Sequence, residues 1–191
     1  MAQANLIVNP LSGEQIVIIR SADQTGGQVL DWELSLAPGG KVPSSHAHPE
    51  QQETFTVLEG TMRFRVGLRR IIAGPGQRVV VPPGTVHHFA NAGPVTARVT
   101  VESRPALRMQ ELLETAAAMA QEQHAARRAL PRPLDLALFM TEFEREVAAP
   151  YLPRVLVRLA MRALARTRRA GTARQASSPA RQALGTARVH N

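Results

Sequence analysis

The chain contains no cysteine, which excludes both a disulfide framework and a metal site built from thiolates. The first 20 residues lack a basic segment followed by a long apolar run, so they do not read as a secretory signal. Polar residues there interrupt every apolar stretch well before it reaches the length needed to cross a bilayer. We therefore expect a soluble, cytoplasmic protein.

Acidic residues are missing from the C-terminal part of the chain. Residues 149–191 contain nine arginines and no acidic residue, whereas residues 1–148 hold the other 14 basic and all 15 acidic side chains. The formal net charge of +8 therefore belongs to the C-terminal end. Four arginines recur there at every fourth position and would form a stripe opposite the leucines of a helix, namely Arg154, Arg158, Arg162 and Arg166.

A basic amphipathic helix of this kind can contact an anionic membrane or nucleic acid. However, no aromatic residues are interleaved with these four arginines, and no recognised nucleic-acid motif is present. We therefore favour a helix whose apolar face packs on the rest of the protein and whose arginines are solvated.

Short alternating segments dominate the first half of the chain. At 191 residues and 44% hydrophobic content, the chain can bury one core with an appendage. Strands are predicted at residues 15–19, 29–36, 54–58, 62–66, 78–81, 87–91 and 96–102, with proline and glycine turns between them. Less distinctive strands between residues 5 and 20 would complete the fold. This density of short strands indicates a β-sandwich or barrel.

After Pro105 the pattern changes to helical spacing with much alanine and leucine. Helices are predicted at residues 107–128, 134–147 and 151–169, separated by prolines, and a disordered basic tail from about Gly171. We therefore divide the chain into a β-barrel at 1–104, an α-helical extension at 105–169 and a tail at 170–191. One apolar stripe should pack against the barrel or a second subunit, and it consists of Leu138, Phe139, Phe143 and Val147.

Two histidines, His46 and His48, are separated by one residue, so on an extended chain both imidazoles leave the same face and can converge on one ion. Glu53 lies five residues beyond His48, an odd offset that would place it on the opposite face of an uninterrupted strand. Pro49 lacks a ladder donor, and the following Glu-Gln-Gln run has no strand character. We therefore predict a turn or bulge between His48 and Glu53.

These three residues belong to the spaced motif Gly40-x5-His46-x-His48-x4-Glu53-x6-Gly60, and a second motif, Gly76-x5-Pro82-x-Gly84-x2-His87-x3-Asn91, adds His87. In both motifs the chain resembles the cupin family at every defining position, and the resemblance covers roughly residues 28–104. It implies a mainly β fold, the double-stranded β-helix or jelly-roll barrel, in which four side chains hold one divalent transition metal. The implied ligands are His46, His48, Glu53 and His87. Such mixed ligation suits iron, manganese, nickel, zinc or copper.

The sequence also leads to predictions for positions outside the implied ligand set. His88 follows His87 on a strand and should point away from the ion, and we expect His124 and His190 to be non-ligating. Gly60 and Gly84 should need a positive φ. Residues 66–73 replace the Gly-Gly or Asn-Gly hairpin common in the family, so we expect a longer or irregular turn there.

For function, the resemblance favours a metal-dependent enzyme acting on a small chelating organic molecule, with dioxygenase-like or polyketide-cyclase-like chemistry. Glu53 would complete the metal shell or act as a catalytic general base. The candidate pocket residues are Trp32, Phe55, Val57 and Phe89, although core packing alone would also explain them. The alternatives are a non-catalytic sensor that binds a small ligand, and a sugar or acid isomerase or epimerase. The resemblance also implies a homodimer, since cupins often pair or exchange edge strands, and such pairing would protect the exposed edges of the barrel.

Overall fold

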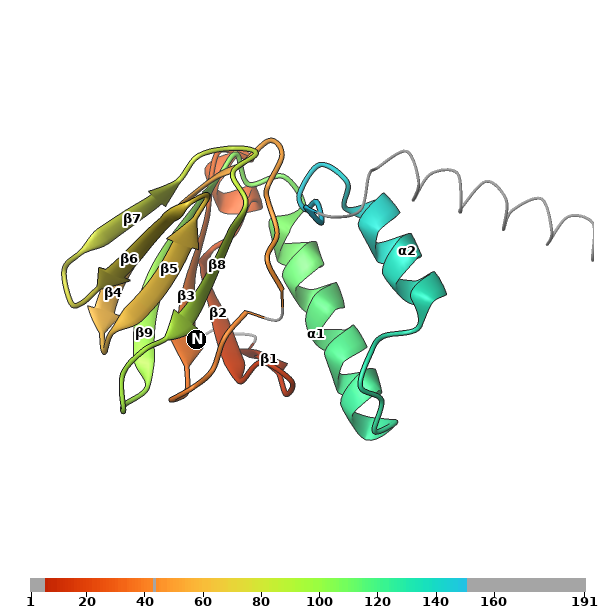
Figure 1. Cartoon of the computed structure of the whole chain (residues 1–191). Coiled ribbons are helices and arrows are strands. Elements are labelled where there is room, and N and C mark those ends of the chain that lie inside the picture. The colour runs from red at the N-terminus through yellow and green to blue at the C-terminus, as the bar shows by residue number, and fades with distance from the viewer. Residues whose placement is uncertain (1–5, 43, 151–191) are drawn as a thin grey trace, which may run out of the picture.

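The structure, a computed structural model, describes residues 6–42 and 44–150 (Figure 1). Its β-strands form two antiparallel sheets. The larger has the order β1-β2-β3-β9-β4-β7, with β1 (Leu6–Asn9), β2 (Glu14–Arg20), β3 (Leu30–Leu36), β9 (Ala97–Arg104), β4 (Gln52–Glu59) and β7 (Arg78–Val81). The smaller has the order β6-β5-β8, with β6 (Arg69–Ala73), β5 (Met62–Val66) and β8 (His87–Asn91).

The two α-helices follow the strands in sequence. They are α1 (Met109–Ala125) and α2 (Pro133–Glu142), both after β9, whereas a short 3-10 helix, η1 (Asp23–Thr25), connects β2 to β3. In Figure 1 both α-helices lie to one side of the sheets, with α1 against β1. In the part of the chain that the structure describes, no helix has the length and apolar character needed to cross a membrane.

The core lies between the two sheets and follows from the alternation along the strands. Every second residue of β3 is buried, and the same holds for β9. Three phenylalanines from both sheets meet at the centre, because the Phe55 ring lies 5.2 Å from that of Phe64 and 5.3 Å from that of Phe89. Burying each such side chain contributes about 1.5–3 kcal/mol to folding. The antiparallel double-sheet fold predicted from the sequence is confirmed.

The β5–β6 hairpin corrects one prediction. Residues 66–73 do not form a longer or irregular turn, because Val66 pairs directly with Arg69 and only Gly67 and Leu68 form the loop. Gly67 supplies a φ of 57°, a left-handed conformation that suits a two-residue hairpin loop. The rest of the segment is the strand β6, which the sequence pattern did not reveal.

The predicted turns around the two motifs are present. The chain bends at Pro49 and Glu50, and this bend resets the strand phase before Glu53, although Gln52 already belongs to β4. Gly60 has a φ of 76°, and a Cβ added there would lie 2.9 Å from the Ala97 Cα. Gly60 therefore permits both the turn after β4 and the close approach of β9.

The second helix is shorter than predicted. It ends at Glu142 rather than continuing to residue 147, because Phe143, only 2% exposed, is drawn into the hydrophobic core. Phe139 and Val147 pack against the same core, whereas Leu138 is 46% exposed. The apolar stripe thus packs on the protein as predicted, except at Leu138. The predicted third helix and the predicted tail lie outside the described residues.

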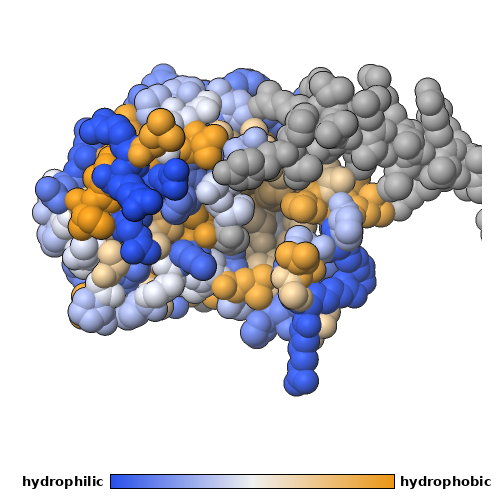
Figure 2. Space-filling model, viewed as in Figure 1, coloured by the Kyte–Doolittle hydropathy of each residue, from blue (hydrophilic) through white to orange (hydrophobic). Residues whose placement is uncertain are grey.

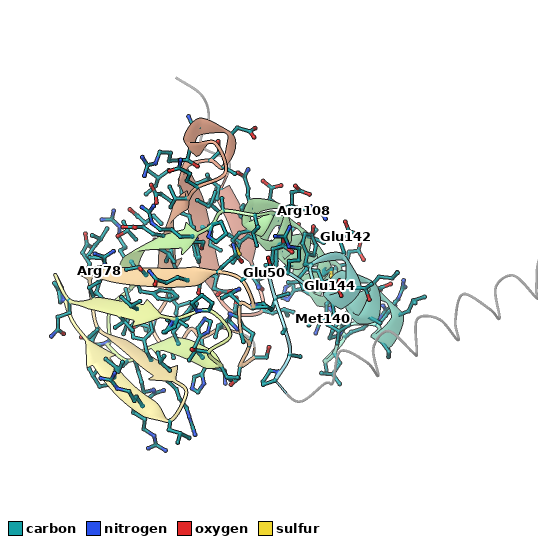
Figure 3. The ribbon with its side chains drawn as sticks, turned by 90° about the horizontal axis from the view of Figure 1, so that it is seen from above. Glu50, Arg78, Arg108, Met140, Glu142 and Glu144 are labelled. Carbon is teal, nitrogen blue, oxygen red and sulfur yellow. The ribbon has the colours of Figure 1, made fainter. Side chains whose placement is uncertain are left out.

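Ion pairs join the two helices at their outer surface. Arg108, just before α1, pairs with Glu142 at the end of α2 at 2.9 Å and with Glu111 of α1 at 2.6 Å. Figure 3 shows Arg108 and Glu142 close together on the helical side of the molecule. Because these groups are about half exposed, their main effect is to orient the helices rather than to stabilise them strongly.

Candidate metal centre

The two sequence motifs meet through backbone pairing. The His46 N–H donates to the His87 carbonyl at 3.1 Å, and the His87 N–H donates to the His46 carbonyl at 2.8 Å. This pairing adds the segment around His46 to the edge of β8. Glu53 enters from the larger sheet, near the start of β4. The centre therefore lies where the two sheets come together.

The three imidazoles converge on one point. Their ring centroids lie 4.9 Å apart for His46 and His48, 4.5 Å for His46 and His87, and 5.2 Å for His48 and His87. One ring nitrogen from each lies within 4.8 Å of the others. His48 and His87 are buried and His46 is half-buried. These three side chains can hold one metal ion.

The other nitrogen of each ring contacts a backbone carbonyl. The Nδ1 atoms of His46, His87 and His48 lie 3.0 Å from the Ser44 oxygen, 3.1 Å from the Thr85 oxygen and 2.5 Å from the Glu146 oxygen, respectively. A carbonyl oxygen only accepts hydrogen bonds, so Nδ1 must carry the proton in each ring. Nε2 is then the atom that remains to bind a metal.

Glu53 faces two of these nitrogens. Its Oε2 lies 3.2 Å from Nε2 of His48 and 3.2 Å from Nε2 of His87. Its Oε1 accepts a hydrogen bond from the Ser103 hydroxyl at 3.4 Å, and Ser103 in turn accepts one from the Trp32 Nε1 at 3.3 Å. Sequence reasoning missed Ser103, although its register opposite Glu53 on β9 would have revealed it had the strand pairing been known.

The surroundings favour a charged carboxylate at Glu53 and a neutral imidazole at His46. Burial raises the pKa of Glu53, but the neighbouring His48 and His87 together hold it well below its usual range. Burial, together with the charges of His48 and His87, lowers the pKa of His46 to about 3. Burial also lowers the pKa of His48, but the Glu53 carboxylate and the hydrogen bonds to Glu53 and Glu146 outweigh it, so that pKa is raised.

The donor set fits a cation. When all three rings are neutral with Nδ1 protonated, three Nε2 lone pairs and one buried carboxylate lie around a common point. Such lone pairs repel one another unless a proton or a metal ion lies between them. Imidazole and carboxylate donors together are typical ligands of divalent transition metals.

The chain beyond α2 also reaches the centre. Ala148 pairs with Ala47, donating to its carbonyl at 2.8 Å and accepting from its N–H at 3.0 Å. This places the Glu146 carbonyl on His48. The Glu146 carboxylate, 3% exposed, accepts from the Arg108 N–H at 3.2 Å. Sequence reasoning missed Glu146, because this residue falls within the helix predicted at residues 134–147.

A surface ion pair joins the same two segments. Arg145 makes a two-pronged contact with Glu50, with a shortest distance of 2.7 Å. Figure 3 shows Glu50 on the side of the barrel that faces the helices. The chain is therefore held against the extension on both sides of His48, by the backbone pair at Ala47 and by this ion pair at Glu50.

The four predicted pocket residues lie in the hydrophobic core. Phe55 and Val57 are fully buried, and Trp32 and Phe89 are nearly so. The Phe55 ring lies 6.4 Å from that of His87, and Trp32 contacts the centre through Ser103. Their role in binding a substrate stays a prediction.

A pocket of about 340 Å³ lies beside His87. It is lined by Ser45, Arg65, Gly67, Leu68, Val86, His87, His88 and Pro150. His88 points away from the other histidines, as predicted, and its Nδ1 lies 3.3 Å from the Ser45 hydroxyl. Burial and the charges of Arg65 and Arg63 lower the pKa of His88.

Fold and site together define a small β-barrel protein with a buried imidazole and carboxylate centre. Residues 32–101 match the family model of the cupin domain. This match agrees with the two motifs and with the two facing sheets, and it identifies this part of the chain as a cupin domain of the cupin superfamily.

Similar proteins include the germin-like protein subfamily T member 3 of Arabidopsis thaliana, which is 32% identical over 73 residues. That match covers 36% of this chain and 32% of the relative, so the chain spans about a third of the length of this curated relative. Among solved structures, a predicted oxalate decarboxylase from Thermotoga maritima is 18% identical, with a TM-score of 0.49, over 54% of this chain and 92% of its own. A protein with a double-stranded β-helix domain from Klebsiella pneumoniae is 23% identical, with a TM-score of 0.45, over 53% and 85%.

Proposed function

We propose that this chain is a metal-dependent cupin enzyme that acts on a small chelating organic molecule. One divalent transition metal would be bound by His46, His48, His87 and Glu53. The observation that carries the proposal is the arrangement of three Nε2 atoms and a carboxylate around one point, with each Nδ1 directed to a backbone carbonyl.

The chain prepares these ligands before any metal arrives. His46 is neutral at physiological pH, because its pKa is lowered to about 3, so it can bind a metal without first losing a proton. The three backbone carbonyls fix the orientation of the rings. Such preorganisation removes much of the entropic cost of assembling the site.

A bound metal ion would supply Lewis-acid chemistry for the oxygens of a chelating substrate. Glu53 would supply the base when its carboxylate shifts off the ion. The Ser103 hydroxyl holds Oε1, and Oε2 is the oxygen that faces the ligands and can accept a proton from a substrate hydroxyl bound there. Trp32 acts as a positioning residue by holding Ser103.

Proton removal from a chelating hydroxyl is the step shared by oxygenation and cyclisation of enediol or polyketide-like compounds. These are the two reactions we favour, in a cytoplasmic homodimer. An isomerase would use the same base to move a proton between neighbouring carbons, and a sensor would bind the ligand without changing it.

The first test is elemental analysis of the purified protein, followed by metal competition with a chromogenic chelator. We expect about one divalent transition metal per chain, and loss of this metal in the double variant His46→Ala and His48→Ala. The bound metal should also raise the melting temperature of the unaltered protein only, since it stabilises the folded state.

The matched control is His124→Ala, which removes an exposed imidazole from the last turn of α1. This variant should keep full metal occupancy. Retention of metal by the double variant, or refusal of every added metal by the unaltered protein, would show that the site is assigned wrongly. Iron, copper, nickel or manganese would direct the search to oxygen-uptake assays, whereas zinc would favour cyclisation or isomerisation.

A further inference from the structure

The outer surface of the β5–β6 hairpin carries a concentration of arginine. Arg63 and Arg65 alternate with the buried Met62 and Phe64 along β5, so both arginines are exposed on the outer face of the smaller sheet. Arg65 pairs with Arg70 across the hairpin on this face, whereas the exposed Arg69 pairs with Val66 and so leaves the ribbon on the other face, next to the tip. Four guanidinium groups therefore belong to one two-stranded ribbon.

Within residues 6–42 and 44–150, none of these four arginines has an acidic partner. No Asp or Glu occurs between Glu59 and Glu102, and all 15 acidic residues of the chain belong to the described part. The ion pairs of those acids engage the other arginines of the barrel, namely Arg20, Arg78, Arg98 and Arg104. No side chain in the described part of the protein therefore neutralises the hairpin.

The arrangement works against the stability of the isolated protein. Arg65 and Arg70 stand directly opposite each other, and like charges in that position destabilise a strand pair. An external anion would remove this repulsion.

Apolar side chains stand among the arginines. Leu68, at the tip of the hairpin, is 92% exposed, and Ile72, which pairs with Arg63 on the neighbouring strand, is 60% exposed. Figure 2 shows strongly hydrophilic and hydrophobic side chains interspersed over the sheets. A protruding leucine flanked by cations, with no acid nearby, is typical of a surface that meets anionic lipid.

The tip of the hairpin also lies beside the start of the basic C-terminal sequence. Gly67 and Leu68 line the same pocket as Pro150. Beyond Pro150 the sequence contains nine further arginines and no acidic residue. The last residue that the structure describes therefore lies beside the tip of the hairpin.

We propose that the β5–β6 hairpin docks on the surface of an anionic membrane. Arg63, Arg65 and Arg70, which share the outer face, would contact the lipid phosphates and carboxylates, and Leu68 would enter the boundary with the acyl chains. Lipid is favoured over nucleic acid because the exposed residues of the hairpin are arginine and aliphatic residues, with no exposed aromatic ring on which bases stack. This inference does not depend on the metal centre.

The test is co-sedimentation of the full chain with vesicles of phosphatidylserine and phosphatidylcholine in equal parts, and with vesicles of phosphatidylcholine alone. We expect binding to the anionic vesicles only, weakening as salt is added. The double variant Arg65→Gln and Arg70→Gln should lower the partition coefficient on the order of 30-fold, given roughly 1 kcal/mol per arginine near an anionic surface. Leu68→Ser should lower it as well, and its effect should persist at high salt.

The matched control is the double variant Arg78→Gln and Arg104→Gln. It removes the same charge, but both arginines pair with Glu102 on the barrel. This control should bind vesicles nearly as well as the unaltered protein. No binding to anionic vesicles, or an equal loss in both double variants, would overturn the proposal. The proposal would also be overturned if the double variant Arg65→Gln and Arg70→Gln lost binding to duplex DNA but kept its binding to vesicles.

Discussion

His46 and His87 are oriented by their own loops, whereas His48 is oriented by a distant part of the chain. The first two donate to carbonyls two residues earlier in the sequence, and His48 donates to a carbonyl 98 residues later. The barrel therefore positions two imidazoles by itself. The third acquires its orientation only when the segment after α2 has docked.

Because of this difference, the orientation of His48 depends on the docking of the helical extension. The segment after α2 is fixed by the buried side chain of Phe143, by the backbone pair of Ala47 and Ala148, and by the ion pair of Arg145 with Glu50. Because the docked segment contacts His48, a change that loosens the extension should reach the metal centre. A change of equal size elsewhere on the helices should not.

The largest effect is expected from Phe143→Ala. Removal of this ring leaves a cavity where the extension meets the core, and should lower the free energy of unfolding by about 3–5 kcal/mol. Urea unfolding measures this loss, and metal competition should show weaker binding in the same variant. Leu138→Ala is the control, because that side chain is 46% exposed, and it should change both quantities little. Unchanged metal affinity in the Phe143 variant would mean that His48 is held without the extension.

A smaller and more local effect is expected from Ala148→Pro. Proline lacks the N–H that donates to the Ala47 carbonyl at 2.8 Å, so the strand-like pairing beside His48 should break. We expect a loss of about 1–3 kcal/mol in stability and of about ten-fold or more in metal affinity. Ala148→Val keeps the N–H and serves as the control. Equal metal affinities in the two variants would argue against positioning of His48 by this segment.

The smallest effect concerns the barrel alone and compares two buried carboxylates. At Glu53 two histidines offset the cost of burial, whereas Glu14 has only the hydrogen bonds from Ser12 and Asn9, so burial raises the pKa of Glu14. A group whose pKa is higher in the folded state favours folding at acid pH, and this contribution is lost as the pH rises through the folded pKa.

Glu14→Gln removes that dependence. The variant should have a higher free energy of unfolding than the unaltered protein at neutral pH, and this difference should disappear as the pH falls toward the ordinary range of a carboxyl group. Denaturant unfolding across this pH range measures the difference. A difference that does not change with pH would show that the Glu14 carboxyl titrates alike in both states.

Local patterns predicted the parts of this molecule that depend on neighbours in sequence. The one-residue separation of His46 and His48, the proline that bends the chain and the alternation of the strands are all visible in short segments. β6 was missed because Arg69, Arg70, Ile71 and Ile72 do not alternate, and because Gly67 and Leu68 form an uncommon loop pair.

Contacts between distant segments could not be predicted in this way. The helical period continues past Glu142, but the burial of Phe143 overrides it and turns the chain back to the barrel. The contacts of Ser103 with Glu53 and of Glu146 with His48 depend on strand register and on docking, neither of which leaves a mark in the neighbouring residues.

The carbonyls that hold the three Nδ1 atoms belong to the main chain, and every amino acid has a carbonyl. Replacing Ser44, Thr85 or Glu146 by another residue would leave these acceptors in place as long as the backbone path is unchanged. Substitution of the neighbouring side chains therefore does not change which nitrogen of each imidazole carries the proton. A lineage could alter these tautomers only by replacing the histidines themselves, or by insertions and deletions that move the loops and the docked segment.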